Sequence, residues 1–220
     1  MQRESTILLI RHGEVEGAHD VLWGRSPGVR LSTTGRKQVQ ALASRLSRVP
    51  LRLVVSSPRP RTMDTARAIA APHRARLHRD VGFDEFDFGD WSGATFEALD
   101  ADPRWHRFND ARSTAGAPDG ETTPAFRVRV AMALRRLVRR RLPVVAVVTH
   151  AEVIRTLVLE SLGLTPDDWA QVPIDTATVT MLAGSHPPLR VVAFNLGSDE
   201  LDPMIGLARR RPAMGRPQVR

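Results

Sequence analysis

The sequence predicts an α/β fold: a three-layer α/β/α sandwich with a mostly parallel central sheet. Apolar runs rich in β-branched residues, such as residues 53–55 and 144–148, have the length of buried strands. Each run is followed by a polar turn and then by a stretch whose apolar residues recur at helical spacing. Strands that alternate with helices in this way form parallel sheets with helices on both faces.

Each element has its own signal in the sequence. The predicted strands are residues 7–10, 53–55, 75–77 at an edge, 144–148, 179–182 and 190–194; the predicted helices are 33–48, 60–71, 123–141 and one from about 152 to Gly163. Ser32 or Thr33 can cap the first helix and Thr122 the third, while Pro60 suits a first helical turn. Between residues 83 and 117 the pattern weakens, which predicts an irregular insertion with short helices over a site.

Composition indicates one globular domain and excludes several kinds of chemistry. Of the 220 residues, 42% are hydrophobic and 25% charged, so we expect a single catalytic domain over residues 1–206. The chain has no cysteine, which excludes disulfides, thiolate metal sites and cysteine nucleophiles. Since Arg11 and His12 interrupt the first apolar run and no segment has the length of a membrane span, a cytoplasmic protein with no membrane partner is expected.

The net charge of +8 is unevenly distributed along the chain. Residues 207–220 hold five arginines and no acid, which leaves +3 for the remainder. This stretch also contains Pro212 and Pro217 and few apolar residues, so we expect a flexible, solvated tail. The five arginines within residues 135–141 are expected to form a solvated helix face. The charge therefore does not indicate a nucleic-acid partner.

Three predicted strand ends carry polar groups that suit an anion. They are Arg11-His12, Ser57 with Arg61, and Thr149-His150. Parallel strands place their carboxyl ends at one edge of the sheet, so these groups are expected to converge. Guanidinium groups match phosphate oxygens, helix N-termini favour anions, and two arginines with a protonated histidine can neutralise the charge that a metal ion would otherwise cover. The pattern predicts a phosphate site with no metal.

These residues belong to a longer ordered set, in which the chain resembles the histidine phosphatase superfamily, the phosphoglycerate-mutase-like proteins. The matching residues are Arg11-His12-Gly13-Glu14, Leu31-Ser32 with Gly35 and Gln38-Val39, Ser56-Ser57-Pro58 with Arg61 and Thr65-Ala66, Glu85 with Gly89, Trp91 and Gly93, Gly120-Glu121-Thr122, and Thr149-His150 with Ile154-Arg155. One such motif is weak evidence, whereas the whole set in order is strong.

The resemblance implies a role for each residue of the candidate site. His12 would be the nucleophile that takes up the phosphoryl group, with its other ring nitrogen donating to a carbonyl or carboxylate. Arg11, Arg61 and His150 would stabilise the transferring group. Glu85 would give a proton to the leaving oxygen and later take one from water. Glu14 and Glu121 are interpreted as structural or helix-capping groups.

The chain departs from the family pattern at two places. Val15 follows Arg-His-Gly-Glu where Thr, Ser or Gln is usual, and residues 18–20 replace a region that usually supplies an asparagine, so His19 or Ser26 would have to make that phosphate contact. Ala151 replaces the glycine that usually follows the second histidine. Three further arginines, Arg25, Arg30 and Arg59, predict a basic rim that favours a polyanionic substrate.

The sequence thus predicts a metal-independent phosphomonoester hydrolase that uses no cofactor, forms a phosphohistidine on His12 and acts on a small phosphate ester. A phosphoglycerate mutase is the alternative enzyme, and a phosphate-binding relative without turnover is the alternative of another class. The short insertion over residues 83–117 favours the hydrolase, and only the altered segment 15–20 favours a relative without turnover. No sequence feature identifies an oligomer interface or the leaving group.

Overall fold

The computed structural model describes residues 4–202, which form a six-stranded sheet in the order β3-β2-β4-β1-β5-β6. The strands are β1 (Ser5–Arg11), β2 (Leu53–Ser56), β3 (Arg76–Arg79), β4 (Val144–Thr149), β5 (Val179–Gly184) and β6 (Arg190–Leu196). The first four strands are parallel to one another, whereas β5 runs antiparallel to β1 and to β6. The predicted sheet is confirmed as mostly parallel.

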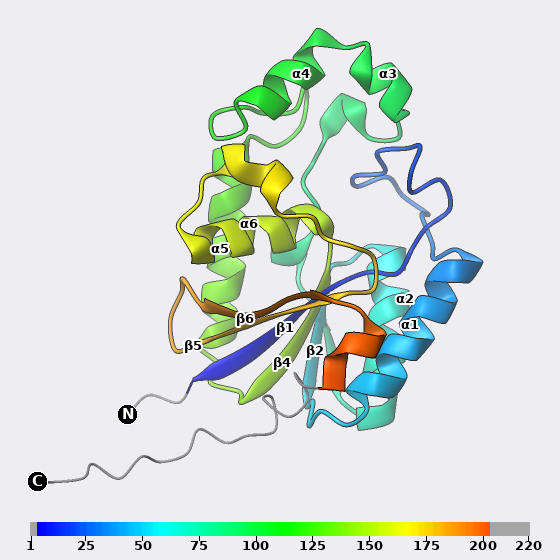
Figure 1. The fold of residues 1–220 in the computed structure, drawn as a ribbon, viewed down its shortest axis with the longest axis vertical. Coiled ribbons are helices and arrows are strands. Elements are labelled where there is room, and N and C mark those ends of the chain that lie inside the picture. Colours follow the sequence, from blue (N-terminus) through cyan, green and yellow to red (C-terminus); the bar gives the residue numbers. More distant parts are fainter. Residues whose placement is uncertain (1–3, 203–220) are drawn as a thin grey trace, which may run out of the picture.

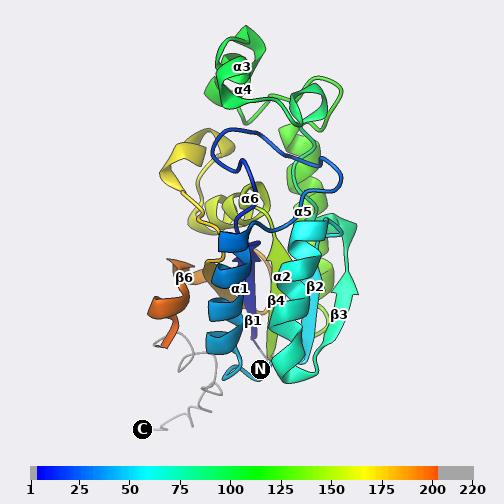
Figure 2. The same cartoon turned by 90° about the vertical axis from the view of Figure 1, so that its right-hand side faces the viewer.

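Helices cover both faces of this sheet, which confirms the three layers. The helices are α1 (Thr33–Leu46), α2 (Pro60–Ala70), α3 (Phe96–Asp100), α4 (Pro103–Asp110), α5 (Thr123–Val138) and α6 (Ala151–Leu162). In Figure 1, α1 and α2 lie on one side of the sheet, and α5 and α6 lie on the other. The short helices α3 and α4 project from one end of the molecule in both views (Figures 1 and 2).

The alternation of side chains along β1 builds two cores. Ile7 and Leu9 pack into the cluster formed with α5 and α6, whereas Leu8 and Ile10 pack against α1 and α2. All four side chains are fully buried. A strand buried on both faces reads as a continuous apolar run, which is why the first strand is recognisable in the sequence.

The helix boundaries follow the predicted capping residues closely. Ser32 accepts a hydrogen bond from the amide of Gly35, and Thr122 accepts one from the amide of Ala125. Gly163 ends α6 in the left-handed conformation, with φ of 71°. The helices α1, α2 and α5 end one to three residues earlier than predicted, because periodicity locates the middle of a helix better than its last turn.

The insertion predicted over residues 83–117 holds α3, α4 and a cluster of aromatic rings. Trp91, Trp105 and Phe108 contact one another with ring centroids 5.2–5.8 Å apart. Backbone hydrogen bonds fasten the loop after β1 to this insertion: the amide of Leu22 donates to Ala94 O at 2.9 Å, and the amide of Phe96 donates to Asp20 O at 2.9 Å. The loop after β1 and the insertion are therefore joined side by side, although they lie far apart in the sequence.

Two glycines let α1 approach the segment that follows His12. A Cβ atom on Gly35 would lie 2.0 Å from the carbonyl oxygen of Glu14, and one on Gly13 would lie 2.6 Å from the carbonyl oxygen of Gly35. Neither contact has room for a methyl group, and backbone atoms cannot move aside cheaply. The glycines thus set the distance between α1 and the end of β1.

The variant Gly35→Ala is expected to lower the free energy of unfolding by at least about 3 kcal/mol, because the added methyl group must displace the backbone at Glu14. Urea denaturation measures this change. Gly28→Ala is the matched control: its φ is +74° but no atom lies within 4 Å of the added carbon. It is expected to cost only about 1 kcal/mol of backbone strain. Equal costs for the two variants would contradict the close-approach argument.

The predicted tail, residues 207–220, lies outside the described residues. Among residues 4–202, no helix is long and apolar enough to cross a membrane.

Candidate active site

Two histidines and two arginines converge where β1, β2 and β4 end. The Nε atom of Arg61 donates to His12 Nε2 at 3.1 Å, and its Nη2 lies 3.2 Å from His150 Nδ1. The two imidazole rings have centroids 5.2 Å apart. Arg11 immediately precedes His12 at the end of β1. Parallel strand ends thus bring these groups to one edge of the sheet, as the alternation of strands and helices predicts.

The ring of His12 is held in one tautomer. Its Nδ1 atom lies 2.7 Å from the carbonyl oxygen of Gly13, which can only accept, so Nδ1 carries the proton. The Nε2 atom therefore keeps its lone pair, which accepts the hydrogen bond from Arg61 Nε. Burial, followed by the charges of Arg61 and Arg11, holds the pKa of His12 well below its ordinary value of 6.5. This imidazole is neutral and can act as a nucleophile through Nε2.

Each of the two arginines buries a guanidinium nitrogen that lacks a partner. Arg11 donates from Nη1 to Ile174 O at 2.5 Å, and Arg61 donates from Nη2 to Gly24 O at 2.6 Å. In contrast, Arg11 Nε and Arg61 Nη1 are buried and have no hydrogen-bond partner within residues 4–202. A buried donor without a partner costs free energy, so these two atoms indicate a place for an acceptor.

His150 contacts Arg61 but is fully buried and does not line the cavity that holds His12. Because its Nδ1 accepts from Arg61, its Nε2 carries the proton and donates to Ser57 Oγ at 2.7 Å. Ser57 Oγ in turn donates to Asp84 Oδ1 at 3.0 Å. Burial and the charge of Arg61 hold the pKa of His150 well below 6.5. The geometry therefore favours a neutral His150 that positions Arg61, not the protonated histidine considered in the sequence analysis.

Glu85 is buried and lines the same cavity as His12 and Arg61. Its Oε1 atom accepts a hydrogen bond from the amide of Phe86 at 2.9 Å. Burial, helped by the charge of Glu152, raises the pKa of Glu85 to about 7. A carboxyl group with this pKa can hold a proton and release it near neutral pH, as a general acid and base must.

The cavity has a volume of about 400 Å³ and two different walls. One wall holds the polar groups described above, namely Arg11, His12, Arg61 and Glu85. The other wall is mostly apolar and comes from the loop after β1, the insertion and the segment after α6; it includes Val15, Ala18, Val21, Leu22, Trp23, Phe88, Phe96, Trp105 and Trp169.

The structure does not bring Ser26 or His19 to this cavity. Neither residue lines it, and His19 is exposed. The amide of Ser26 instead donates to Trp23 O at 2.8 Å and closes a turn. The phosphate contact that the altered segment lacks is therefore not replaced by either side chain in this geometry.

The predicted basic rim is wrong, because its arginines are paired with acids. Arg59 hydrogen-bonds to Asp84, Arg25 contacts Asp87 and Glu121, and Arg30 contacts Asp64; none of these arginines lines the cavity. Burial works to raise the pKa of Asp84, but hydrogen bonds from Arg59, the charge of Arg59 and hydrogen bonds from the Glu85 amide and Ser57 together outweigh it and lower the pKa below its ordinary value. Arg25 and Arg59 make partly buried ion pairs, and Arg30 is an exposed arginine paired with Asp64.

The structural interpretation of Glu14 and Glu121 is confirmed. Glu14 Oε1 accepts from Ser32, the cap of α1, at 2.8 Å. Glu121 is paired with Arg25 at 2.8 Å and with Arg129 at 2.7 Å. Neither carboxylate lines the cavity that holds His12.

Sequence reasoning missed an ionic cluster that lines the cavity beside Glu85. Arg112 pairs with Glu152 at 2.8 Å, and Arg155 pairs with the other carboxylate oxygen of Glu152. Arg112 also lies over the ring of Trp169, at 4.1 Å from the centroid. Arg155 belongs to the matched Ile154-Arg155 pair, but nothing local to the sequence connects it to Arg112. The cluster forms only when α6 meets the loop after α4.

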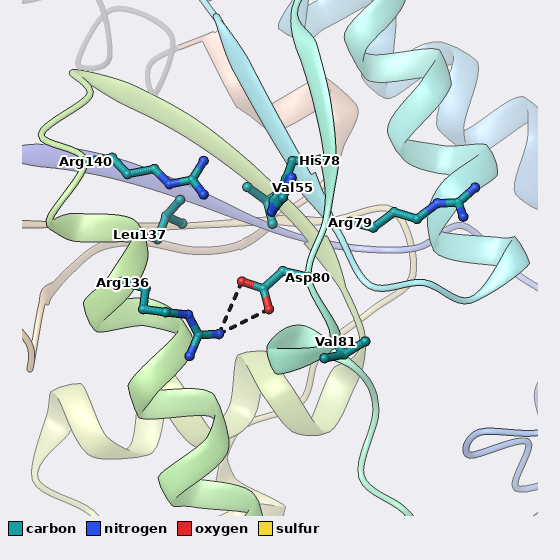
Figure 3. Close-up of a pocket in the computed structure, with 8 residues that line it drawn as sticks. All are labelled: Val55, His78, Arg79, Asp80, Val81, Arg136, Leu137 and Arg140. Carbon is teal, nitrogen blue, oxygen red and sulfur yellow. Dashed lines mark hydrogen bonds and ion pairs between the residues drawn. The ribbon is translucent and has the colours of Figure 1, made fainter.

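A second hollow, of about 350 Å³, lies between the edge strand β3 and α5. Arg136 donates there to Asp80 at 3.2 Å, and Figure 3 shows Arg79 pointing away from the other labelled side chains. Val55 and Leu137 supply apolar surface in this hollow. None of the residues that line it provides a nucleophile paired with a general acid. Within residues 4–202, no group of three or more His, Asp or Glu side chains is placed to hold a metal ion.

Comparison with known proteins identifies the family of the chain. The family model of the histidine phosphatase superfamily, branch 1, matches residues 7–197. A glucosyl-3-phosphoglycerate phosphatase of Mycolicibacterium vanbaalenii is 30% identical over 178 residues, which cover 76% of this chain and 78% of that protein. An uncharacterized protein of Mycobacterium tuberculosis is 39% identical over 80 residues; the match covers 36% of this chain and only 40% of that relative's length.

Solved structures show the same fold. A crystal structure of phosphoserine phosphatase from Entamoeba histolytica, in complex with 3-phosphoglyceric acid, superposes with a TM-score of 0.76. It is 25% identical in sequence, and the match covers 87% of this chain and 97% of that one. The resemblance seen in the ordered motifs is thereby confirmed by the family model, by sequence relatives and by the fold. The chain is a member of the histidine phosphatase superfamily.

Proposed function

We propose that the protein hydrolyses phosphomonoesters through a phosphohistidine on Nε2 of His12. The observation that carries the proposal is the pairing of a neutral His12, whose Nε2 keeps its lone pair, with two buried guanidinium nitrogens that lack acceptors. A phosphoryl group placed at Nε2 would offer its oxygens to Arg11 Nε and Arg61 Nη1. Two of the similar proteins, the glucosyl-3-phosphoglycerate phosphatase and the phosphoserine phosphatase, support the same chemistry.

In the first step, the hydrogen bond from Arg61 Nε to His12 Nε2 breaks, and the lone pair of Nε2 forms a bond to phosphorus as the bond to the ester oxygen breaks. Glu85, protonated below its pKa of about 7, gives its proton to that oxygen, and the alcohol leaves. In the second step, water attacks phosphorus and loses a proton to the Glu85 carboxylate as the nitrogen–phosphorus bond breaks. Orthophosphate is then released, and both residues return to their starting states.

Arg11 and Arg61 stabilise the negative charge on the transferring group in both steps. His150 acts through Arg61, which it contacts at 3.2 Å, and Ser57 with Asp84 holds His150 in place. The two guanidinium groups supply fixed positive charge where the phosphoryl oxygens lie, so the proposed steps require no metal ion.

The proposal is tested with 4-nitrophenyl phosphate labelled with ³²P, in buffer containing EDTA. We expect release of nitrophenol and a labelled protein after rapid denaturation, with the label stable to alkali and lost in acid, as phosphohistidine is. No nitrophenol release from this and a panel of other esters would contradict the hydrolase. Release without label would contradict the covalent step, and inhibition by EDTA would contradict metal independence.

Arg61→Lys is expected to lower kcat/KM for this substrate about 10²-fold and to weaken inhibition by orthophosphate. A lysine has one ammonium group, which cannot contact His12, Gly24 O and a phosphate oxygen together. Arg67→Lys is the matched control, since Arg67 lies on the same helix, is exposed and pairs with Asp64. Equal kinetics for the two variants would contradict the proposed role of Arg61.

A further inference from the structure

We propose that this site selects esters whose leaving group is an uncharged alcohol bearing a bulky apolar or aromatic group. This inference rests on the proposed hydrolysis and names the class of substrate. Three features of the mostly apolar wall of the cavity, called the outer wall, support it. They are its exposed surface, the hydrogen bonds of its polar groups, and the backbone bonds that hold it in place.

The outer wall exposes large apolar side chains to the cavity. Leu22, Trp23, Phe96, Trp105 and Trp169 all line it and are all only partly buried, whereas the apolar residues of β1 are fully buried. Soluble proteins rarely gather large apolar groups at one accessible place without a ligand that covers them. Contact with an apolar leaving group would remove this surface from water.

Most polar groups of the same wall already have partners. Arg112 uses all three guanidinium nitrogens, two on Asn109 Oδ1 and one on Glu152. Both oxygens of Glu152 accept from arginines, and Arg155 also donates to Val172 O. The amide nitrogen of Asn109 donates to Trp105 O at 2.9 Å. A charged leaving group would have to compete with these bonds, while an apolar group would leave them intact.

The two ends of the cavity therefore differ in their hydrogen bonding: one end has donors without acceptors, and the other has charged groups that are already paired. At the phosphate end, Arg11 Nε and Arg61 Nη1 are buried without acceptors. At the other end, the carboxylate of Glu152 offsets one of the two arginine charges, and the remaining cation lies against the aromatic faces of Phe108 and Trp169. A dianionic phosphate on an apolar alcohol complements both ends.

The apolar wall is also held in place before a substrate arrives. The loop after β1 and the start of α3 share backbone hydrogen bonds of 2.8–2.9 Å, and the indole of Trp23 donates to Glu16 O at 2.9 Å. Side chains presented on such a fixed surface lose little freedom when they contact a ligand.

The test compares three phosphate esters of primary alcohols: 2-phenylethyl phosphate, ethyl phosphate and O-phosphoserine. Because kcat/KM reports the steps up to departure of the alcohol, it is the quantity to compare even when hydrolysis of the phosphoenzyme limits kcat. We expect kcat/KM for 2-phenylethyl phosphate to exceed that for each of the other two about tenfold or more. Equal or higher values for ethyl phosphate or phosphoserine would overturn the inference. A preference for phosphoserine would show that the net charge of the arginine cluster determines which leaving group is preferred.

Single substitutions test which residues of the wall cause the preference for 2-phenylethyl phosphate. Phe96→Ala and Leu22→Ala are each expected to reduce the ratio of kcat/KM for 2-phenylethyl phosphate to that for ethyl phosphate about three- to tenfold. Val128→Ala, an exposed apolar residue on α5 outside the cavity, is the matched control and should leave the ratio unchanged. A ratio unaffected by both cavity variants would overturn the assignment of this wall.

Because the ratio compares two substrates of the same protein sample, partial loss of folded enzyme does not change it. Failure to hydrolyse any of the three esters would overturn the proposed hydrolysis, and this inference with it. Hydrolysis of all three without the preference would overturn the inference alone.

Discussion

Replacing His12 by alanine is expected to lower kcat/KM for 4-nitrophenyl phosphate by about 10⁴-fold or more and to abolish ³²P labelling of the protein. No other imidazole among residues 4–202 both lines the cavity and lies against Arg61 as His12 does. His150 does not take over, because its Nε2 atom donates to Ser57 and its Nδ1 atom accepts from Arg61. Loss of the imidazole thus removes the proposed nucleophile and, with it, the proposed covalent intermediate.

His78→Ala is the matched control for this variant. His78 is exposed and lines the hollow beside β3, so its loss should leave both kinetics and labelling unchanged (Figure 3). Circular dichroism would establish that each variant is folded. Substantial labelling of the His12→Ala protein would assign the nucleophile to another residue and contradict the proposed mechanism.

The second large effect is expected from Glu85→Gln, which leaves the shape of the side chain but removes its proton transfer. For ethyl phosphate, whose alkoxide leaves poorly, kcat/KM should fall about 10³-fold. For 4-nitrophenyl phosphate the loss should be much smaller, because nitrophenolate leaves without protonation. Glu97→Gln, on the exposed face of α3, is the control. Equal losses on the two substrates would contradict a general acid.

The pH dependence of the wild-type protein provides an independent measurement. Since Glu85 must be protonated to act as the acid and its pKa is about 7, kcat/KM for ethyl phosphate should fall above pH 7. The low pKa of His12 keeps the nucleophile neutral throughout this range. In the Glu85→Gln protein the fall above pH 7 should be absent, and its persistence would assign it to another group.

Glu85 should also make stability depend on pH in a definite direction. Burial raises its pKa from the ordinary value of 4.5 to about 7, so the folded state holds a proton that the unfolded state loses. Its contribution to stability is complete below pH 4.5 and is lost as pH rises to 7, a change of about 3 kcal/mol. Glu85→Gln should therefore stabilise the protein at pH 8 relative to wild type but not at pH 4, as thermal denaturation can show.

Local patterns were sufficient to predict much of this fold. The run from Ile7 to Ile10 marks a strand buried on both faces, and Ser32, Thr122 and Gly163 mark helix ends through backbone chemistry that needs no tertiary contact. The convergence of His12 with Arg61 and His150 followed from the rule that parallel strands end at one edge. These inferences depend on residues close in sequence or on topology alone.

The wrong prediction of a basic rim and the missed ionic cluster both concern pairs of side chains that only the folded chain brings together. Arg59 and Asp84 are 25 positions apart, and Arg112 and Glu152 are 40 apart, so no local pattern indicates that they pair. A count of arginines therefore predicted a basic rim where the structure has arginines paired with acids outside the cavity. The same limitation hid the position of His150 behind Arg61, because a strand end fixes where a residue lies but not which way its ring faces.

The backbone hydrogen bonds between Leu22 and Ala94, and between Phe96 and Asp20, have a consequence for the evolution of this site. Because main-chain atoms make the bonds, they do not depend on which side chains the wall carries. Mutations at Leu22 or Phe96 can then change the shape of the leaving-group side while the wall keeps its position over His12. In the proposed enzyme, the catalytic groups and the side chains that select the substrate are thus separate sets of atoms, and one substrate can replace another in evolution without a change in the proposed catalytic residues.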